Sequence, residues 1–236
     1  MIDQAPRLSA QLSRVLTDQI AFLFFRPFKP NLKDMWRAYL AWGLFTTWLV
    51  GIGRYWDHPK AHVWQYAGLG SVVYVFALAV LLWLILLPFK RENLSYLNIL
   101  IFITLTSLPA VFYAIPVERF LSLQSAQTVN VWFLMIVAAW RVALYVTFLR
   151  RVGRFSPVTV GVLTLLPLAL IVTTLTGLNL EHAVFQTMGG IRDATPNDSA
   201  YGVMVVVSLL SVLSTPILLI WYGFLVYATM KNRGVE

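Results

Sequence analysis

A single arginine, Arg141, stands within the apolar stretch IVAAWRVALY, which covers residues 136–145. Its guanidinium is permanently charged, and placing such a charge near the middle of a membrane-spanning helix costs at least about 2.5 kcal/mol. A partner is therefore expected, yet the long apolar segments of the chain contain no aspartate or glutamate. The chemistry that this position suggests is binding of an anion, such as a lipid phosphate or a substrate carboxylate.

The alternative role for Arg141 is structural. Prolines lack an N–H and leave unbonded the backbone carbonyl one helical turn earlier. The carbonyls concerned are those of Leu105, Leu163 and Val212, which precede Pro109, Pro167 and Pro216. Hydroxyl groups lie beside them, and the candidate partners of Arg141 are Thr104, Thr106, Ser107, Ser211 and Ser214. Arg141 either bonds these oxygens and joins three kinked helices, or faces a cavity that takes an anion.

A second group of polar residues is predicted at the external ends of the spans. It comprises Arg54, Asp57, His58, His62, Glu118, Arg119, Glu181 and His182. The i, i+4 spacing of His58 and His62 would put both rings on one helix face, where carboxylates could complete a metal site. Pro59 interrupts that spacing and no known metal motif is present, so we predict no metal and no cofactor. We expect local ion pairs among Arg54, Asp57, Glu118 and Arg119 instead.

Composition and hydropathy define the elements that must position these residues. The chain has 236 residues, of which 59% are hydrophobic and 12% charged, against about 25% charged in a soluble domain. The apolar residues fall in blocks of about 20, long enough to cross a bilayer as helix. We predict an all-α, polytopic membrane bundle with six transmembrane helices. The expected spans are 36–53, 67–89, 95–117, 127–149, 157–178 and 201–229.

The charges predict how these spans are oriented. The net charge of +8 comes from short Lys/Arg clusters next to the apolar blocks, which is typical of topology signals rather than of nucleic-acid binding. These clusters lie in the N-terminal segment, near 90–91 and 150–154, and at the C-terminus. The positive-inside rule then places both termini in the cytoplasm and the protein in a cell (inner) membrane. The same basic face would meet anionic lipid headgroups.

Residues 1–35 form a separate cytoplasmic segment in this interpretation, ahead of a single six-span domain at 36–236. Leu8, Leu12, Val15 and Leu16 fall on one stripe of a helix, and Arg14 falls opposite. This pattern predicts an amphipathic helix, which lies either in the membrane interface or against the spans of its own bundle.

Two central segments resemble the Yip family of multispanning membrane proteins and its bacterial relatives. They are NILIFITLTSLPAVFYAIP, with polar residues before its proline, and VWFLMIVAAWRVALY. The resemblance covers about 60 residues and implies a membrane organiser or adaptor rather than an enzyme. The six expected spans depart from the five that are usual in that family.

Three functions are compatible with the sequence. The first is a non-enzymatic organiser or accessory subunit that binds lipid or a partner protein, with homo-oligomerisation or a membrane-protein partner as options. The second is a small transporter or channel subunit with an anion or lipid-headgroup site at Arg141. The third is an intramembrane enzyme acting on lipid, which would need an acid/base pair such as Glu181 with His182. Nothing in the sequence resembles a catalytic motif, so we expect no enzyme.

Overall fold

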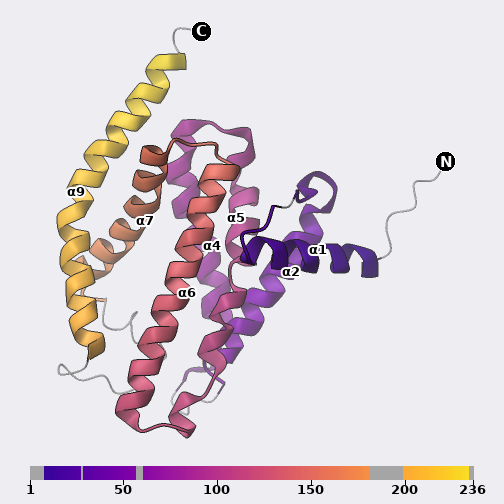
Figure 1. Cartoon of the computed structure of the whole chain (residues 1–236), viewed down its shortest axis with the longest axis vertical. Helices are drawn as coiled ribbons and strands as arrows, with labels where there is room; N and C mark the ends of the chain where they lie inside the picture. Colours follow the sequence, from indigo (N-terminus) through magenta and orange to yellow (C-terminus); the bar gives the residue numbers. More distant parts are fainter. Residues whose placement is uncertain (1–7, 28, 57–60, 181–198, 234–236) are drawn as a thin grey trace.

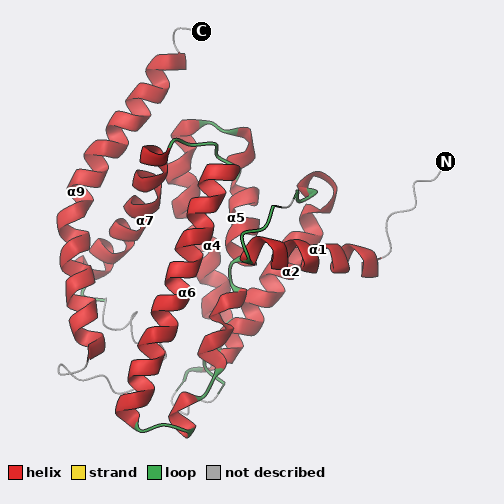
Figure 2. Cartoon of the chain, in the orientation of Figure 1, coloured by secondary structure: helices red, strands yellow, loops and turns green. Residues whose placement is uncertain are grey.

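The computed structural model describes residues 8–27, 29–56, 61–180 and 199–233. All regular elements within these residues are helices (Figure 2), which confirms the all-α prediction. The α-helices are α1 (Leu8–Leu23), α2 (Leu32–Gly53), α3 (Val63–Tyr66), α4 (Leu69–Leu86), α5 (Tyr96–Leu105), α6 (Leu123–Arg151), α7 (Pro157–Gly177) and α9 (Ser199–Arg233). Short 3-10 helices follow α4 and α5: η1 (Leu87–Phe89), η2 (Glu92–Leu94), η3 (Leu108–Ala114) and η4 (Val117–Arg119).

Four helical segments are long and apolar enough to cross a membrane, and they support a membrane-embedded protein. They are Leu69–Phe89, Gln124–Arg151, Pro157–Gly177 and Gly202–Lys231. A fifth candidate is the pair Tyr96–Leu105 and Leu108–Arg119, which is bent by 40° at the break between them. The predicted count of six is not confirmed. The first predicted span, 36–53, lies in α2, which is not among the candidate spans, since it contains Arg37, tryptophans, threonines and glycines.

Polar caps fix where several helices begin. The Oγ atoms of Ser95, Ser122 and Ser156 accept a hydrogen bond from the backbone N–H three residues later, at the starts of α5, α6 and α7. Asn31 caps α2 in the same way. Such caps stabilise a helix by about 1 kcal/mol each. The caps therefore mark the residues at which these four helices begin.

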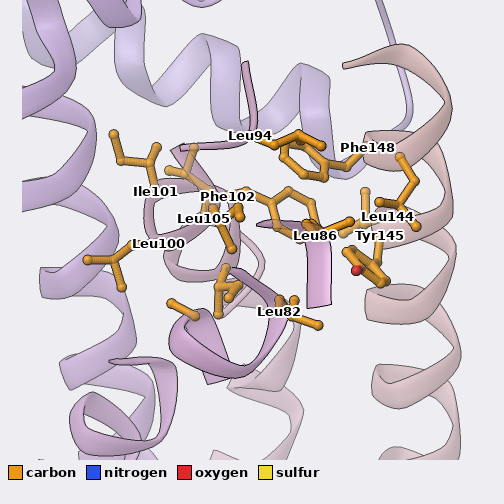
Figure 3. Close-up of a cluster of buried hydrophobic side chains, with 14 of the residues drawn as sticks. Leu82, Leu86, Leu94, Leu100, Ile101, Phe102, Leu105, Leu144, Tyr145 and Phe148 are labelled. Carbon is orange, nitrogen blue, oxygen red and sulfur yellow. The ribbon is translucent and has the colours of Figure 1, made fainter. Parts of the chain in front are cut away.

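The core is built around α5, in which every residue from Ile99 to Leu105 is buried. A helix that is apolar on all sides lies inside a bundle or in a membrane, and the neighbouring helices enclose α5 here. Phe102 stacks on Phe148 of α6 with ring centroids 4.3 Å apart (Figure 3). Phe102 also makes an edge-to-face contact with Phe22 of α1, with ring centroids 5.6 Å apart. α5 thus ties α1 and α6 together.

α9 forms one edge of the bundle and packs mainly along α7 (Figure 1). Thr173 and Thr215 join the two helices through a hydrogen bond of 2.9 Å between their hydroxyls. Tyr222 on α9 donates to the carbonyl of Ile85 at 2.8 Å. Much of the remaining α9 surface consists of exposed leucine, valine and isoleucine, as expected of a helix that faces lipid.

α1 runs crosswise to the other helices and lies against them (Figure 1). Val15 and Phe22 are buried in the core, and the hydroxyl of Tyr39 on α2 donates to Asp18. Trp140 on α6 donates from its indole Nε1 to the carbonyl of Leu23 at 2.9 Å. The interfacial placement of α1 is not confirmed. The bundle covers its apolar stripe only in part, because Leu12 and Ile20 are 42% and 50% exposed. Whether 1–35 is a unit of its own stays a prediction.

Candidate anion-binding sites

Arg141 projects from α6, one turn after the buried Val137. Its guanidinium lies over the ring of Tyr74 on α4, with Cζ 5.8 Å from the ring centroid. Within the described part of the chain, Arg141 has no recorded hydrogen bond to a carbonyl or a hydroxyl. The guanidinium of Arg141 therefore contacts an aromatic ring. The structural role considered above would instead require hydrogen bonds to carbonyl and hydroxyl oxygens.

Arg54 follows directly after α2 and reaches the same region. Its guanidinium lies over the ring of Tyr113 on η3, at 4.8 Å from the centroid. The residue is partly exposed, but its Nε is inaccessible to solvent and has no partner among the described residues. Burial lowers the pKa of Arg54 from its ordinary value, and the positive charge of Arg141 acts in the same direction. The two guanidinium groups thus interact electrostatically, each over the ring of a tyrosine.

The helix directions explain why these two arginines converge. Val50 of α2 and Val137 of α6 belong to one small buried cluster, and each arginine follows its valine by one turn. α2 and α6 run in opposite directions (Figure 1). Because side chains on a helix lean toward its N-terminus, both arginines lean back toward the level of the valine cluster. Arg141 therefore interacts with Arg54, which the sequence analysis placed in the external polar cluster.

Four of the five hydroxyl groups proposed as partners of Arg141 make other hydrogen bonds. Thr104 and Thr106 donate to carbonyls of their own helix turn, and Ser107 pairs with the hydroxyl of Thr47 at 2.8 Å. On α9, the hydroxyl of Ser214 donates to the carbonyl of Ser211 at 3.3 Å. These contacts hold helices locally and leave Arg141 without an oxygen partner in the described residues.

The predicted external cluster is only partly within the described residues, since Asp57, His58, Glu181 and His182 lie outside them. Glu118 accepts a hydrogen bond of 2.8 Å from Asn130. The guanidinium of Arg119 lies 4.9 Å from the ring centroid of Trp56. His62 precedes α3 and its N–H donates to Gln65.

No ion pair joins the described members of this cluster. The described residues also contain no group of His, Cys, Asp or Glu arranged to hold a metal ion. The cluster itself stays a prediction.

A basic cavity lies at the other end of the bundle, and the sequence analysis did not identify it. Its volume is about 260 Å³. The lining comes from the end of η1, the start of α7 and the last turns of α9: Phe89, Arg91, Arg154, Phe155, Ser156, Thr159, Leu225, Ala228 and Thr229. Three separate parts of the sequence meet here. The only signal available was the positive charge at 90–91 and 150–154, which was interpreted as a topology signal.

The electrostatics of this cavity favour an anion. Two arginines line it, and no carboxylate is among its lining residues. The guanidinium of Arg91 lies 5.9 Å from the ring centroid of Phe155. Ser156, Thr159 and Thr229 add hydroxyl groups, and the first turn of α7 contributes the partial positive charge of a helix N-terminus. Arg154 has a positive φ of 51°, an uncommon conformation for a residue with a side chain.

No protein family, curated protein or solved structure matches this chain. The resemblance to the Yip family therefore rests on the two quoted spans alone.

Proposed function

We propose that this chain is a non-enzymatic membrane protein that binds anionic lipid headgroups in the basic cavity. The observation that carries the proposal is a cavity with two arginines and no carboxylate at the shared end of three candidate spans. Basic pockets between transmembrane helices on the cytoplasmic side are typical sites for anionic lipid headgroups. In this proposal the cavity faces the cytoplasm of a cell (inner) membrane, and both termini lie on that side.

The chemistry of the cavity lining favours a lipid phosphate as the ligand. Guanidinium groups match phosphate oxygens in a bidentate geometry, and hydroxyl groups supply further donors. The lining also includes Phe89, Leu225 and Ala228, which suit the glycerol and upper acyl carbons. Next to Leu225, Phe224 is 70% exposed and offers an apolar path along α9 for an acyl chain. A free inorganic anion would make no use of this apolar half of the cavity.

Native mass spectrometry tests this proposal directly. The protein, purified in a mild detergent, is titrated with phosphatidylglycerol or with phosphatidylcholine, and retained lipid is counted. We expect preferential retention of phosphatidylglycerol by the wild type. The double variant Arg91→Gln/Arg154→Gln should weaken that binding about 100-fold or more, since it removes two charged groups whose hydrogen bonds contribute about 1.5–3 kcal/mol each.

The matched control is Arg150→Gln. Arg150 is an exposed arginine in the last turn of α6 and does not line the cavity. This variant removes a positive charge near the same end of the bundle and should bind phosphatidylglycerol like the wild type. Equal retention by the double variant and the wild type would show that the cavity is not the lipid site.

A further inference from the structure

Arg54 and Arg141 bring two positive charges into the region between α2 and α6, and no described carboxylate is paired with either. Among the described groups that act electrostatically on Arg54 there is no carboxylate; they are tyrosines and Arg141. Burying even one unpaired charge costs several kcal/mol, and a second charge of the same sign adds repulsion. A fold that holds both guanidinium groups in one region is therefore more stable when an anion lies between them.

Unused hydrogen-bond donors in this region also favour a bound anion. A guanidinium has five N–H donors in one plane, and a contact between its face and an aromatic ring leaves that edge free. Arg54 and Arg141 each make such a contact, with Tyr113 and Tyr74 respectively. The Nε of Arg54 is buried and has no partner among the described residues. A buried donor without an acceptor costs about 1–3 kcal/mol.

We propose that Arg54 and Arg141 form a binding site for one oxyanion, a carboxylate or phosphate group, enclosed by α2, α4, α6 and η3. The oxyanion accepts hydrogen bonds from the N–H edges of both guanidinium groups. Contact with the rings of Tyr74 and Tyr113 fixes the orientation of the two guanidinium planes. Tetrahedral and planar oxyanions both fit bidentate recognition by arginine. The group belongs either to a small soluble anion or to the phosphate of a lipid.

This site is separate from the basic cavity. The two share no residue, and Tyr74 lies about 15 residues before Phe89 along α4 and η1, which corresponds to roughly 22 Å of helix. Loss of binding at one site should therefore leave the other intact. The proposal also does not depend on lipid binding at Arg91 and Arg154.

The first experiment uses inorganic phosphate as the probe. The full chain, purified in a neutral detergent, is titrated with sodium phosphate or with sodium chloride at equal ionic strength, and its Tm is recorded. We expect a saturable rise in Tm with phosphate. Arg54→Met and Arg141→Met should each weaken the apparent affinity for phosphate about tenfold or more. Arg150→Met is the matched control and should respond like the wild type.

A second arm separates the two sources of the oxyanion. Phosphatidylglycerol and phosphatidylcholine are compared as additives in mixed micelles, with the same variants. A response to soluble phosphate assigns a soluble oxyanion, and a response to phosphatidylglycerol alone that both methionine variants lose assigns a lipid phosphate. The proposal is overturned if neither probe stabilises the wild type. It is equally overturned if both methionine variants keep the full response.

Two further variants guard against misfolding and against confusion with the cavity. Arg54→Glu introduces a carboxylate beside Arg141, so we expect a folded protein whose Tm no longer depends on either probe. The cavity variant Arg91→Gln/Arg154→Gln should keep the response of the arginine pair to phosphate. If Arg54→Glu folds and still responds to phosphate like the wild type, the site at Arg54 and Arg141 is ruled out.

Discussion

The side chain of Gln19 replaces a backbone donor that Pro109 removes. Its Nε2 donates to the carbonyl of Leu105 at 3.0 Å, across 86 residues of sequence. Its Oε1 accepts from the indole Nε1 of Trp42 at 2.7 Å. Gln19 is 1% exposed, so both bonds are shielded from water. The break between α5 and η3 is thus completed by a residue of α1.

Replacing Gln19 should therefore destabilise the whole bundle. Gln19→Leu keeps an apolar contact of similar size but leaves the carbonyl of Leu105 and the indole of Trp42 without partners. At about 1–3 kcal/mol for each buried group, we expect a loss of roughly 2 kcal/mol or more. Chemical or thermal unfolding in detergent measures it. Gln11→Leu on the same helix is the control, and equal stability of the two variants would contradict this role.

Close packing of α2 on α5 predicts an effect at Gly43. A Cβ added there would meet the side chain of Thr104, with 2.7 Å to the Cβ of that residue. Overpacking of this kind costs about 1–3 kcal/mol, so Gly43→Ala should lower the Tm of the purified protein. Gly161 on α7 is the matched control, because a Cβ there has nothing within 4 Å. Gly161→Ala should leave stability unchanged or raise it by up to about 1 kcal/mol.

Single-cysteine labelling can determine the orientation that we propose. The chain has no native cysteine, so each introduced thiol reports one position. Positive charges on the connections near residues 90 and 150 predict that these face the cytoplasm. In intact cells, Gln124→Cys should react with a membrane-impermeant maleimide, whereas Asn93→Cys should react only after permeabilisation. Labelling of Asn93→Cys in intact cells would reverse the orientation.

The sequence predicted the helices well but not the contacts between them. Hydropathy located α4, α6, α7 and α9 and the broken span around Pro109, because burial in lipid demands long apolar runs. The first predicted span, in α2, is not confirmed, because that helix contains many weakly apolar residues. Which side chains meet across two helices depends on the rotation of each helix about its axis and on the angle at which the helices cross. Hydropathy carries information on neither.

The arginines illustrate this limit. Arg54 was grouped with Asp57 because both follow the same predicted span. Asp57 lies outside the described residues, so this grouping stays a prediction. In the structure Arg54 also interacts electrostatically with Arg141, since α2 and α6 run in opposite directions and both arginines lean back toward one valine cluster. The proline at 109 correctly indicated an unbonded carbonyl at Leu105, but the donor is Gln19 and not Arg141. An isolated glutamine on an amphipathic helix gave no sign of a partner 86 residues later.

α1 precedes the other described helices, and several partners of this end of the chain lie far along the sequence. Trp140 bonds the carbonyl of Leu23, and Arg151 bonds the carbonyls of Phe25 and Arg26, at sequence separations of 117, 126 and 125 residues. A ribosome that adds about 5–20 residues per second needs roughly 6–25 s to make that length. Until α6 has been made, α1 can dock only on the elements that precede α6, such as α2, whose Tyr39 and Trp42 bond Asp18 and Gln19. The contacts of α1 with α6 therefore form last and close the bundle during biogenesis.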